Sequence, residues 1–249
     1  MFLESFAKSG LTIPVPMARQ PLGLQSLFTG QPLERFAAGQ ILFFEGDPAR
    51  SIFQVVEGTL RILRILPDGR RVITGFLHAG DILGISFGNH YICSAEAIDD
   101  VAIRRLSRAA FENEVETSSE IRPAVLQQFS EEMAAAQDQM VLLSTKNAEE
   151  RLCSLLLKEL QRAMRAGAAE PVVQLPMTRQ DIADYLGLTI ETVSRTMTKL
   201  TSKGVVAACG RHAVRIQRRA LLAQLAGDGD ECADDWHAAE TSRQKRRRH

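Results

Sequence analysis

Glycines punctuate short apolar runs between residues 33 and 106, and this spacing constrains the fold of the 249-residue chain more than any other feature. Turn signals such as Pro67-Asp68-Gly69 lie between the runs and favour tight hairpins over helices. Several short strands at this spacing predict a small antiparallel β-barrel or jelly roll, which we place at residues 32–118. The glycines that define the pattern are Gly39, Gly46, Gly58, Gly69, Gly75, Gly80 and Gly84.

Between Ser107 and Gly167 the chain has no glycine, and from about residue 122 to 143 the apolar residues follow a helical period. Their spacing of three or four positions places them on one face of a long helix, which we assign to residues 119–145. The opposite face is strongly polar, so we expect the apolar stripe to pair with a second subunit. Packing of the stripe against the chain's own barrel is the alternative. The predicted dimerisation residues are Val125, Phe129, Met133, Ala136, Met140 and Leu143.

Residues 178–203 predict two helices joined by a short turn. Thr178 is a suitable N-cap for a first helix through Leu186, and Gly187 supplies the break. Thr189 can cap a second helix from residue 190 to about 203. Apolar residues at 193, 197 and 200 of the second helix face the first, as in a helix-turn-helix, whose second helix enters the major groove of DNA.

The side chains left outside on this second helix have the chemistry that reads base edges. Arg195 can donate two hydrogen bonds to guanine, Glu191 can accept one from cytosine, and Ser194 can contact a thymine methyl. Glu191 and Arg195 are also four residues apart, so an intrahelical ion pair is an alternative that can coexist with base contact. Further candidate DNA contacts are Thr178, Thr189 and Thr192.

After the second helix, residues 204–216 predict two short strands that turn near Gly210 and Arg211. Such a hairpin is the wing of a winged helix domain, which we place at residues 146–226. Arg211 at its tip is either a phosphate contact or an ordinary surface arginine. Cys209 lies in the same hairpin, where oxidation would disturb DNA contact, and this is a minor redox hypothesis.

The two ends of the chain carry no sustained pattern. We expect a loosely held arm at residues 1–31 and a disordered tail at residues 227–249. The tail ends in RQKRRRH, which would add weak, nonspecific attraction to DNA.

Charge is distributed unevenly although the net charge is zero. Residues 178–220 hold eight Lys or Arg against three acidic residues, a net charge of +5 that leaves −5 for the rest. A basic segment is typical of a domain that binds the phosphates of a nucleic acid. A solvated basic face that binds nothing would have the same composition.

Other function classes lack their signatures in this sequence. The four cysteines are far apart and form no CxxC pair, which predicts neither a metal site nor a disulfide framework. We find no P-loop, GxSxG or HExxH motif, so we expect no enzyme and no catalytic residue. Without a secretory signal or a membrane span in the sequence, we expect a cytoplasmic protein.

Taken together, these motifs resemble the Crp/Fnr superfamily of transcription regulators and, within it, the FixK-like branch. The resemblance spans about residues 33–222. It is strongest in LPMTRQDIADYLGLTIETVSRTMTKL at 175–200, and GDILG at 80–84 and CSAEAIDD at 93–100 support it. It implies an α+β chain with a cyclic-nucleotide-binding-like sensor barrel, a dimerisation helix and a C-terminal winged helix-turn-helix.

The same resemblance implies a homodimer that binds an inverted repeat of TTGAT-like half-sites in double-stranded DNA. In such members the counterpart of Arg195 takes the guanine, that of Glu191 the paired cytosine, and that of Ser194 the neighbouring thymine. It further implies an activator that recruits RNA polymerase to microaerobic, denitrification or nitrogen-fixation genes.

Departures from the superfamily pattern predict a regulator without a cofactor. Cyclic-AMP-responsive members carry a glutamate soon after the GD-x-x-G turn and an Arg-Ser pair before the next strand, whereas here only Ser94 remains. A phosphate buried without a cation is costly, so we expect no bound nucleotide. Iron–sulfur members need an N-terminal cysteine cluster, and no cysteine precedes Cys93.

Three alternatives stay open at this point. A haem-dependent sensor would use His78 or His90 as an axial ligand, although isolated histidines are usually plain surface residues. A redox-responsive regulator would use Cys209. A ligand-sensing module would bind protein, in place of DNA, through its winged helix.

Overall fold

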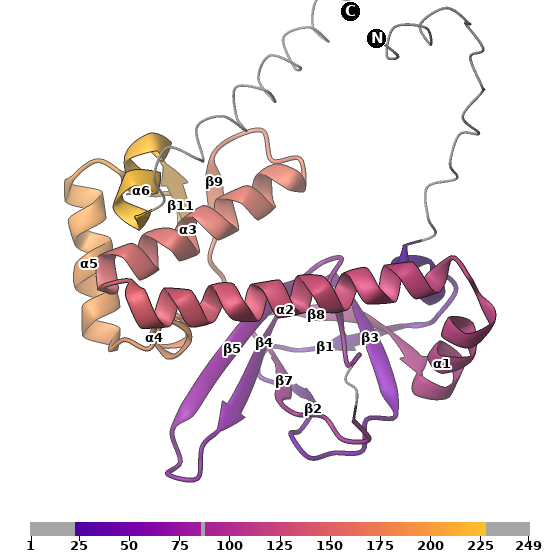
Figure 1. Ribbon diagram of the computed structural model, residues 1–249. Helices are drawn as coiled ribbons and strands as arrows, with labels where there is room; N and C mark the ends of the chain where they lie inside the picture. The colour runs from indigo at the N-terminus through magenta and orange to yellow at the C-terminus, as the bar shows by residue number, and fades with distance from the viewer. Residues whose placement is uncertain (1–22, 86–87, 228–249) are drawn as a thin grey trace, which may run out of the picture.

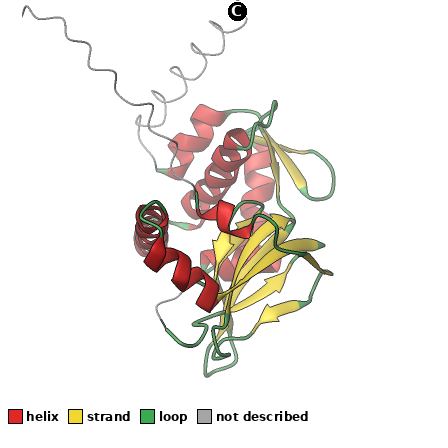
Figure 2. Cartoon of the chain, turned by 90° about the vertical axis from the view of Figure 1, so that its right-hand side faces the viewer, coloured by secondary structure: helices red, strands yellow, loops and turns green. Residues whose placement is uncertain are grey.

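A computed structural model describes residues 23–85 and 88–227 of the chain (Figure 1). It confirms the predicted α+β class, with an antiparallel β-domain, a long helix and a C-terminal winged helix-turn-helix. The predictions for residues 1–22 and 228–249 lie outside the described residues. In the perpendicular view the strands of the barrel gather at one end, and most of the helices lie at the other (Figure 2).

Two four-stranded antiparallel sheets form the barrel, with strand orders β1-β8-β3-β6 and β2-β7-β4-β5. The core between them is apolar and draws on both sheets, for example through Phe53 of β3 and Leu60 of β4. Gly58 joins these two strands with φ +83°, and a Cβ there would lie 2.4 Å from the carbonyl oxygen of Asp100, so this turn requires glycine. The strands are β1 (Leu33–Phe36), β2 (Ile41–Phe43), β3 (Ser51–Glu57), β4 (Thr59–Ile65), β5 (Arg71–His78), β6 (Ile82–Leu83), β7 (Ser94–Ala97) and β8 (Val101–Ser107).

Part of the predicted arm is structured. The short 3-10 helix η1 (Leu24–Phe28) buries Leu24 and Phe28 against an apolar cluster that includes Phe111 of helix α1 (Arg108–Thr117). The expectation of a loose arm is therefore wrong for residues 24–28, because two apolar side chains four positions apart find a common site to bury.

Two consecutive helices connect the barrel to the C-terminal domain. Helix α2 (Ile121–Thr145) runs along the barrel, and helix α3 (Ala148–Arg165) follows it after a short turn (Figure 1). Asn147 starts α3 with a capping box, in which its side chain accepts from the backbone N–H of Glu150 and the Glu150 carboxylate accepts from the backbone N–H of Asn147. None of the described helices is both long and apolar enough to cross a bilayer.

The C-terminal domain combines helix α3 and three further helices with a three-stranded sheet of order β10-β11-β9. Strand β9 pairs with β11 and adds a third strand to the predicted wing hairpin. One apolar cluster joins this domain to the barrel, since Leu63, Ile73 and Phe76 of β4 and β5 belong to it. The elements are β9 (Val172–Gln174), α4 (Arg179–Leu186), α5 (Ile190–Ser202), β10 (Val206–Ala208), β11 (Ala213–Ile216) and α6 (Arg219–Ala226).

Candidate nucleic-acid interface

Capping residues define the two helices of the helix-turn-helix. The Thr178 hydroxyl accepts from the backbone N–H of Asp181 at 3.1 Å at the start of α4. Gly187 ends α4 in the left-handed region with φ 62°, which a side chain would strain. The Thr189 hydroxyl then accepts from the backbone N–H of Thr192 at 3.2 Å and starts α5. These short-range bonds define where α4 begins and ends and where α5 begins.

One side of α5 is buried against the rest of the domain. Val193, Met197 and Leu200 lie in the apolar cluster that also holds Ile182 and Leu186 of α4. This is the packing that the spacing of the apolar residues indicated, and it forces the other side of α5 outward.

Glu191, Ser194 and Arg195 are all exposed at the N-terminal half of α5. Within the described residues no hydrogen bond or ion pair engages the Arg195 guanidinium, so its donors are available to a ligand. Hydrogen bonds from its own backbone N–H and from the Thr189 hydroxyl lower the pKa of Glu191, and the Arg195 charge adds a smaller effect in the same direction. The arrangement presents an ionised acceptor and an unengaged donor one helical turn apart.

The threonines predicted to contact DNA already have partners in the chain. The Thr178 hydroxyl donates to Asp181 Oδ2 at 2.7 Å while it accepts the capping N–H of Asp181. The hydroxyls of Thr189 and Thr192 lie 3.1 Å apart. These threonines therefore shape the helix ends, and their contact with DNA stays a prediction.

The wing carries the other two candidates. Arg211 and Cys209 are both exposed near the turn between β10 and β11. The backbone N–H of Cys209 donates to the carbonyl of Ala213 at 2.9 Å, so the hairpin closes around this turn. Both residues lie in the hairpin that the sequence predicts, and their roles stay predictions.

Part of the basic charge is neutralised within the domain. Lys199 and Lys203 both form ion pairs with Glu149 of α3, and the Lys203–Glu149 distance is 2.9 Å. Arg215 pairs with Glu170 at 3.0 Å. Lys199, Lys203 and Arg215 therefore offer phosphates less free cationic charge than a count of basic residues suggests.

The apolar stripe of α2 divides between two faces. Val125 is only 7% exposed and packs in the same cluster as Phe111, and Phe129 lies partly buried beside it. Val125 is thus unsuited to the predicted dimer contact, because it already packs inside its own protomer. Leu126, which the prediction missed, is 66% exposed and lies seven and fourteen residues before Met133 and Met140, which are 65% and 68% exposed.

The remaining members of the predicted stripe, Ala136 and Leu143, are exposed as well. The structure describes a single chain, so what covers this face stays a prediction.

Aromatic rings fill the barrel beside the 93–100 motif. The ring centroids of Phe43 and Tyr91 lie 3.8 Å apart, and that of Phe53 lies 5.6 Å from Phe43 and 6.4 Å from Tyr91. The Tyr91 hydroxyl donates to the Ser51 carbonyl at 2.7 Å. The Ser94 hydroxyl accepts from the backbone N–H of Glu45 at 2.9 Å, so it is committed to the fold.

The two histidines considered as haem ligands lie in different surroundings. His90 is exposed, and its backbone forms an isolated antiparallel β-bridge with Pro48. His78 is largely buried, with its Nε2 atom 3.6 Å from a carboxylate oxygen of Glu159, beside a cavity of about 370 Å³. Iron at His78 Nε2 would have to displace that carboxylate.

Two family models match the chain. Residues 33–118 match the cyclic nucleotide-binding domain, and residues 150–225 match the Crp-like helix-turn-helix domain.

Curated relatives and a solved structure cover most of the chain. It is 43% identical over 176 residues to the nitrogen fixation regulation protein FixK of Bradyrhizobium diazoefficiens, covering 69% of this chain and 73% of that protein. It is 42% identical to the transcriptional activatory protein AadR of Rhodopseudomonas palustris, covering 69% and 72%. The structure of FixK2 from Bradyrhizobium japonicum aligns with a TM-score of 0.74 at 33% identity, covering 78% of this chain and 96% of that one.

Proposed function

Because the chain belongs to the Crp/Fnr family of transcription regulators and to its FixK-like branch, we propose that it binds a palindromic operator as a homodimer and reads each half-site with α5. The observation that carries the proposal is the outward projection of Glu191, Ser194 and Arg195 from a helix whose other side is buried. A helix held in this way can enter the major groove without disturbing the core of its domain.

The chemistry of the three side chains assigns their roles. Arg195, whose guanidinium has no hydrogen bond within the described residues, donates to O6 and N7 of guanine. Glu191 is held ionised at the start of α5 and accepts from N4 of the paired cytosine. Each such pair discriminates against a wrong base by about 1–3 kcal/mol. TTGAT-type half-sites, taken from the family resemblance, supply a guanine for Arg195.

Dimerisation through the exposed face of α2 would place two copies of α5 on one side of the assembly. Leu126, Met133 and Met140 recur at the seven-residue interval that two parallel helices bury between them. A two-fold dimer meeting a two-fold operator presents recognition helices about 34–36 Å apart, in successive major grooves.

The barrel residues do not fit a cyclic nucleotide, although the barrel matches that family model. Tyr91 and Phe43 stack inside the barrel, and Ser94 already holds the Glu45 backbone. Arg64, which lies nearby, is paired with Glu45, with Nε 3.0 Å from Oε1. A buried phosphate would therefore meet no uncommitted cation in this part of the described chain. We propose binding without a nucleotide, and without an iron–sulfur cluster, since no cysteine precedes Cys93.

The relatives suggest which genes such a regulator controls. Two of them are a nitrogen fixation regulation protein and a transcriptional activatory protein, and a third, 34% identical, is the fumarate and nitrate reduction regulatory protein of Escherichia coli. We extend this to the present chain as control of nitrogen-fixation, denitrification or microaerobic genes. The regulator would act in the cytoplasm and activate transcription by recruiting RNA polymerase.

A quantitative DNA-binding assay without added nucleotide tests the proposal. The wild-type protein should bind a TTGAT-type palindrome, and Arg195→Ala should lose about 10- to 100-fold in affinity and its preference for the guanine, while folding and dimerisation persist. Arg211→Ala is the matched control, since losing a phosphate contact weakens binding to all sequences alike. Binding that required cyclic AMP, or an Arg195→Ala variant as selective as wild type, would refute the proposal.

A further inference from the structure

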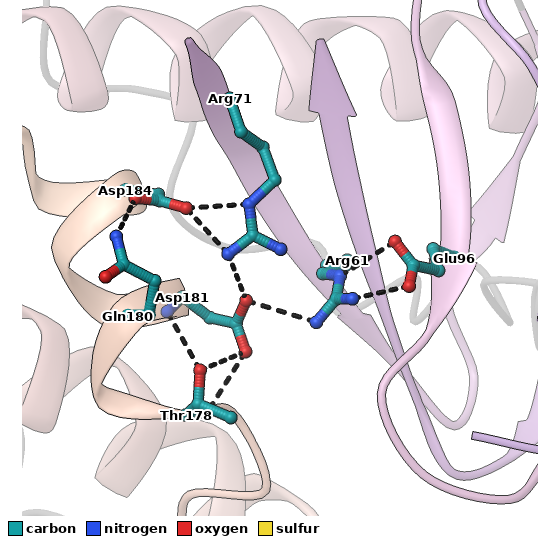
Figure 3. A network of polar contacts seen from close by, with 7 residues as sticks. All are labelled: Arg61, Arg71, Glu96, Thr178, Gln180, Asp181 and Asp184. Carbon is teal, nitrogen blue, oxygen red and sulfur yellow. Dashed lines mark hydrogen bonds and ion pairs between the residues drawn. The ribbon is translucent and has the colours of Figure 1, made fainter. Parts of the chain in front are cut away.

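A network of buried charges joins the barrel to the first helix of the helix-turn-helix (Figure 3). Its centre is Asp181 of α4, which is 1% exposed. Asp181 Oδ1 accepts from Arg61 Nη1 of β4 at 3.1 Å and from Arg71 Nη2 of β5 at 2.9 Å. Asp181 Oδ2 accepts from the backbone N–H and the hydroxyl of Thr178 at 2.9 and 2.7 Å. One carboxylate thus holds both the cap of α4 and the β4–β5 hairpin.

Each arginine is held in turn by a second carboxylate. Arg61 Nε donates to Glu96 of β7 at 3.1 Å, so its guanidinium is aligned by its own sheet. Arg71 Nε donates to Asp184 Oδ2 at 2.7 Å, one turn further along α4. The five side chains come from three barrel strands and one helix, and their planar groups leave little freedom of orientation.

This network differs in kind from the apolar contact beside it. Apolar surfaces of β5 and α4 attract one another without a preferred direction, so they permit small sliding and rotation. Hydrogen-bonded ion pairs are directional and weaken when their angle changes, and because these are largely buried, salt screens them weakly. The hydrogen bonds of Asp181 with its two arginines therefore constrain the angle between α4 and the hairpin.

The angle of α4 also sets that of α5, because the two helices share the apolar cluster of Ile182 and Val193. Helix α2 runs along the barrel, whereas α5 belongs to the C-terminal domain (Figure 1). In a dimer formed through α2, the distance between the two copies of α5 depends on how each C-terminal domain is held against its barrel.

We propose that Arg61 and Arg71 are positioning residues for DNA recognition, which act through Asp181 to fix the separation of the two recognition helices and hence the half-site spacing that the dimer accepts. This inference rests on the proposed function. It assigns a role in operator selection to barrel residues that lie outside the helix-turn-helix.

The test measures affinity for a series of palindromes whose half-sites are moved together or apart by one base pair. We expect the wild-type protein to prefer one spacing by about tenfold or more. Arg61→Gln and Arg71→Gln should reduce this preference to about threefold or less, mainly by improving relative binding at wrong spacings. Discrimination at the guanine read by Arg195 should persist, and Arg71→Lys should restore part of the spacing preference.

Arg64→Gln is the matched control. Arg64 lies on the same strand as Arg61, but its partner is Glu45, and its side chain is about half exposed. Its removal should leave the spacing preference unchanged. The positioning role would be overturned if the Arg61→Gln and Arg71→Gln variants kept the wild-type spacing preference. It would also be overturned if they lost affinity by the same factor at every spacing. A wild-type protein that binds no palindrome would refute the proposed function instead.

If the wild-type protein binds no palindrome, a measurement without DNA still tests whether Arg61 and Arg71 position the C-terminal domain. A nitroxide on Cys209 reports the distance between the two wings of the dimer, once Cys93 and Cys232 are replaced by serine. The distance distribution should be narrow in this background and with Arg64→Gln, and broader with Arg61→Gln. An unchanged width in the Arg61→Gln variant would contradict the proposal.

Discussion

The ring of Phe76 on β5 lies 5.2 Å from the ring of Tyr185 on α4, with the two planes inclined by 54°. Both residues belong to the cluster that forms the core of the C-terminal domain. The barrel hairpin therefore supplies part of that core, and the interface between the domains is packed like an interior. We expect the two domains to unfold together.

Replacing Phe76 with alanine should uncouple the domains. Phe76 is 9% exposed, and truncation of a buried phenylalanine costs about 3–5 kcal/mol of unfolding free energy. The single thermal transition expected of the wild type should move to lower temperature and separate into two in a calorimetric scan. Phe44→Ala, which removes a largely exposed ring, should change stability little. An equal loss in both variants would contradict the shared core.

A charge on the exposed face of α2 should break the dimer. Met140→Lys would place two ammonium groups opposite each other near the two-fold axis, where the wild type buries apolar surface. We expect sedimentation to show a dimer for the wild-type protein and a monomer for the variant, with normal circular dichroism.

Ala134→Lys is the control for this experiment. Ala134 is exposed on α2 but outside the row of residues spaced seven apart at 126, 133 and 140. If Ala134→Lys dissociated the protein as readily as Met140→Lys, or if neither did, the assignment of the dimer face would be wrong.

The α2 face shows where sequence reasoning loses resolution. A spacing of three and four fits both Val125 and Leu126 as the start of the stripe. Only the position of the barrel decides which of the two side chains is buried within its own protomer. The helix-turn-helix was predictable because its signals are local: Thr178 and Thr189 cap the helices, and Gly187 adopts the left-handed conformation that ends α4.

Long-range partners left no comparable signal. Arg61 and Asp181 are 120 residues apart, and nothing near either residue in the sequence identifies the other. Nothing in the sequence indicates the ion pairs of Lys199 and Lys203 with Glu149 either. Both lysines were therefore included in the basic charge expected to meet phosphates. Strand β9 was missed because three residues are too few to show a period, and only β11 gives them a partner.

The cysteines should react with thiol reagents at different rates. Cys209 is exposed, whereas burial raises the pKa of Cys93 to about 11 and that of Cys153 to about 12. At pH 8 maleimide should therefore label Cys209 well before Cys93 or Cys153, as peptide mass spectrometry would show.

Operator DNA should slow this labelling if the wing lies on the duplex, and labelled protein should bind the operator more weakly. A Cys209→Ser variant should bind as well as the unlabelled wild type, and treatment with maleimide should not weaken its binding to the operator. Equal labelling with and without operator DNA would place the wing away from the duplex and would remove the basis for redox control through Cys209.

The buried pair of His78 and Glu159 gives a prediction for pH dependence. Burial, together with the charges of Arg162 and Lys158, lowers the pKa of His78 to about 3 from its usual 6.5. Although the two side chains are only 3.6 Å apart, the imidazole is therefore neutral at neutral pH. Burial also raises the pKa of Glu159, which weakens its ability to hold a proton on the ring.

The folded protein binds a proton at His78 less readily than the unfolded chain does. The stability that neutral His78 contributes is thus complete above pH 6.5 and is lost as the pH falls from 6.5 toward 3, with a slope of at most about 1.4 kcal/mol per pH unit. Glu159 opposes this trend, because the folded state binds its proton more readily than the unfolded chain does. Urea unfolding between pH 7.5 and 5 should show a smaller loss for His78→Gln than for the wild type. The exposed-site variant His90→Gln should follow the wild type, and an NMR titration of His78 near pH 6.5 would contradict the neutral ring.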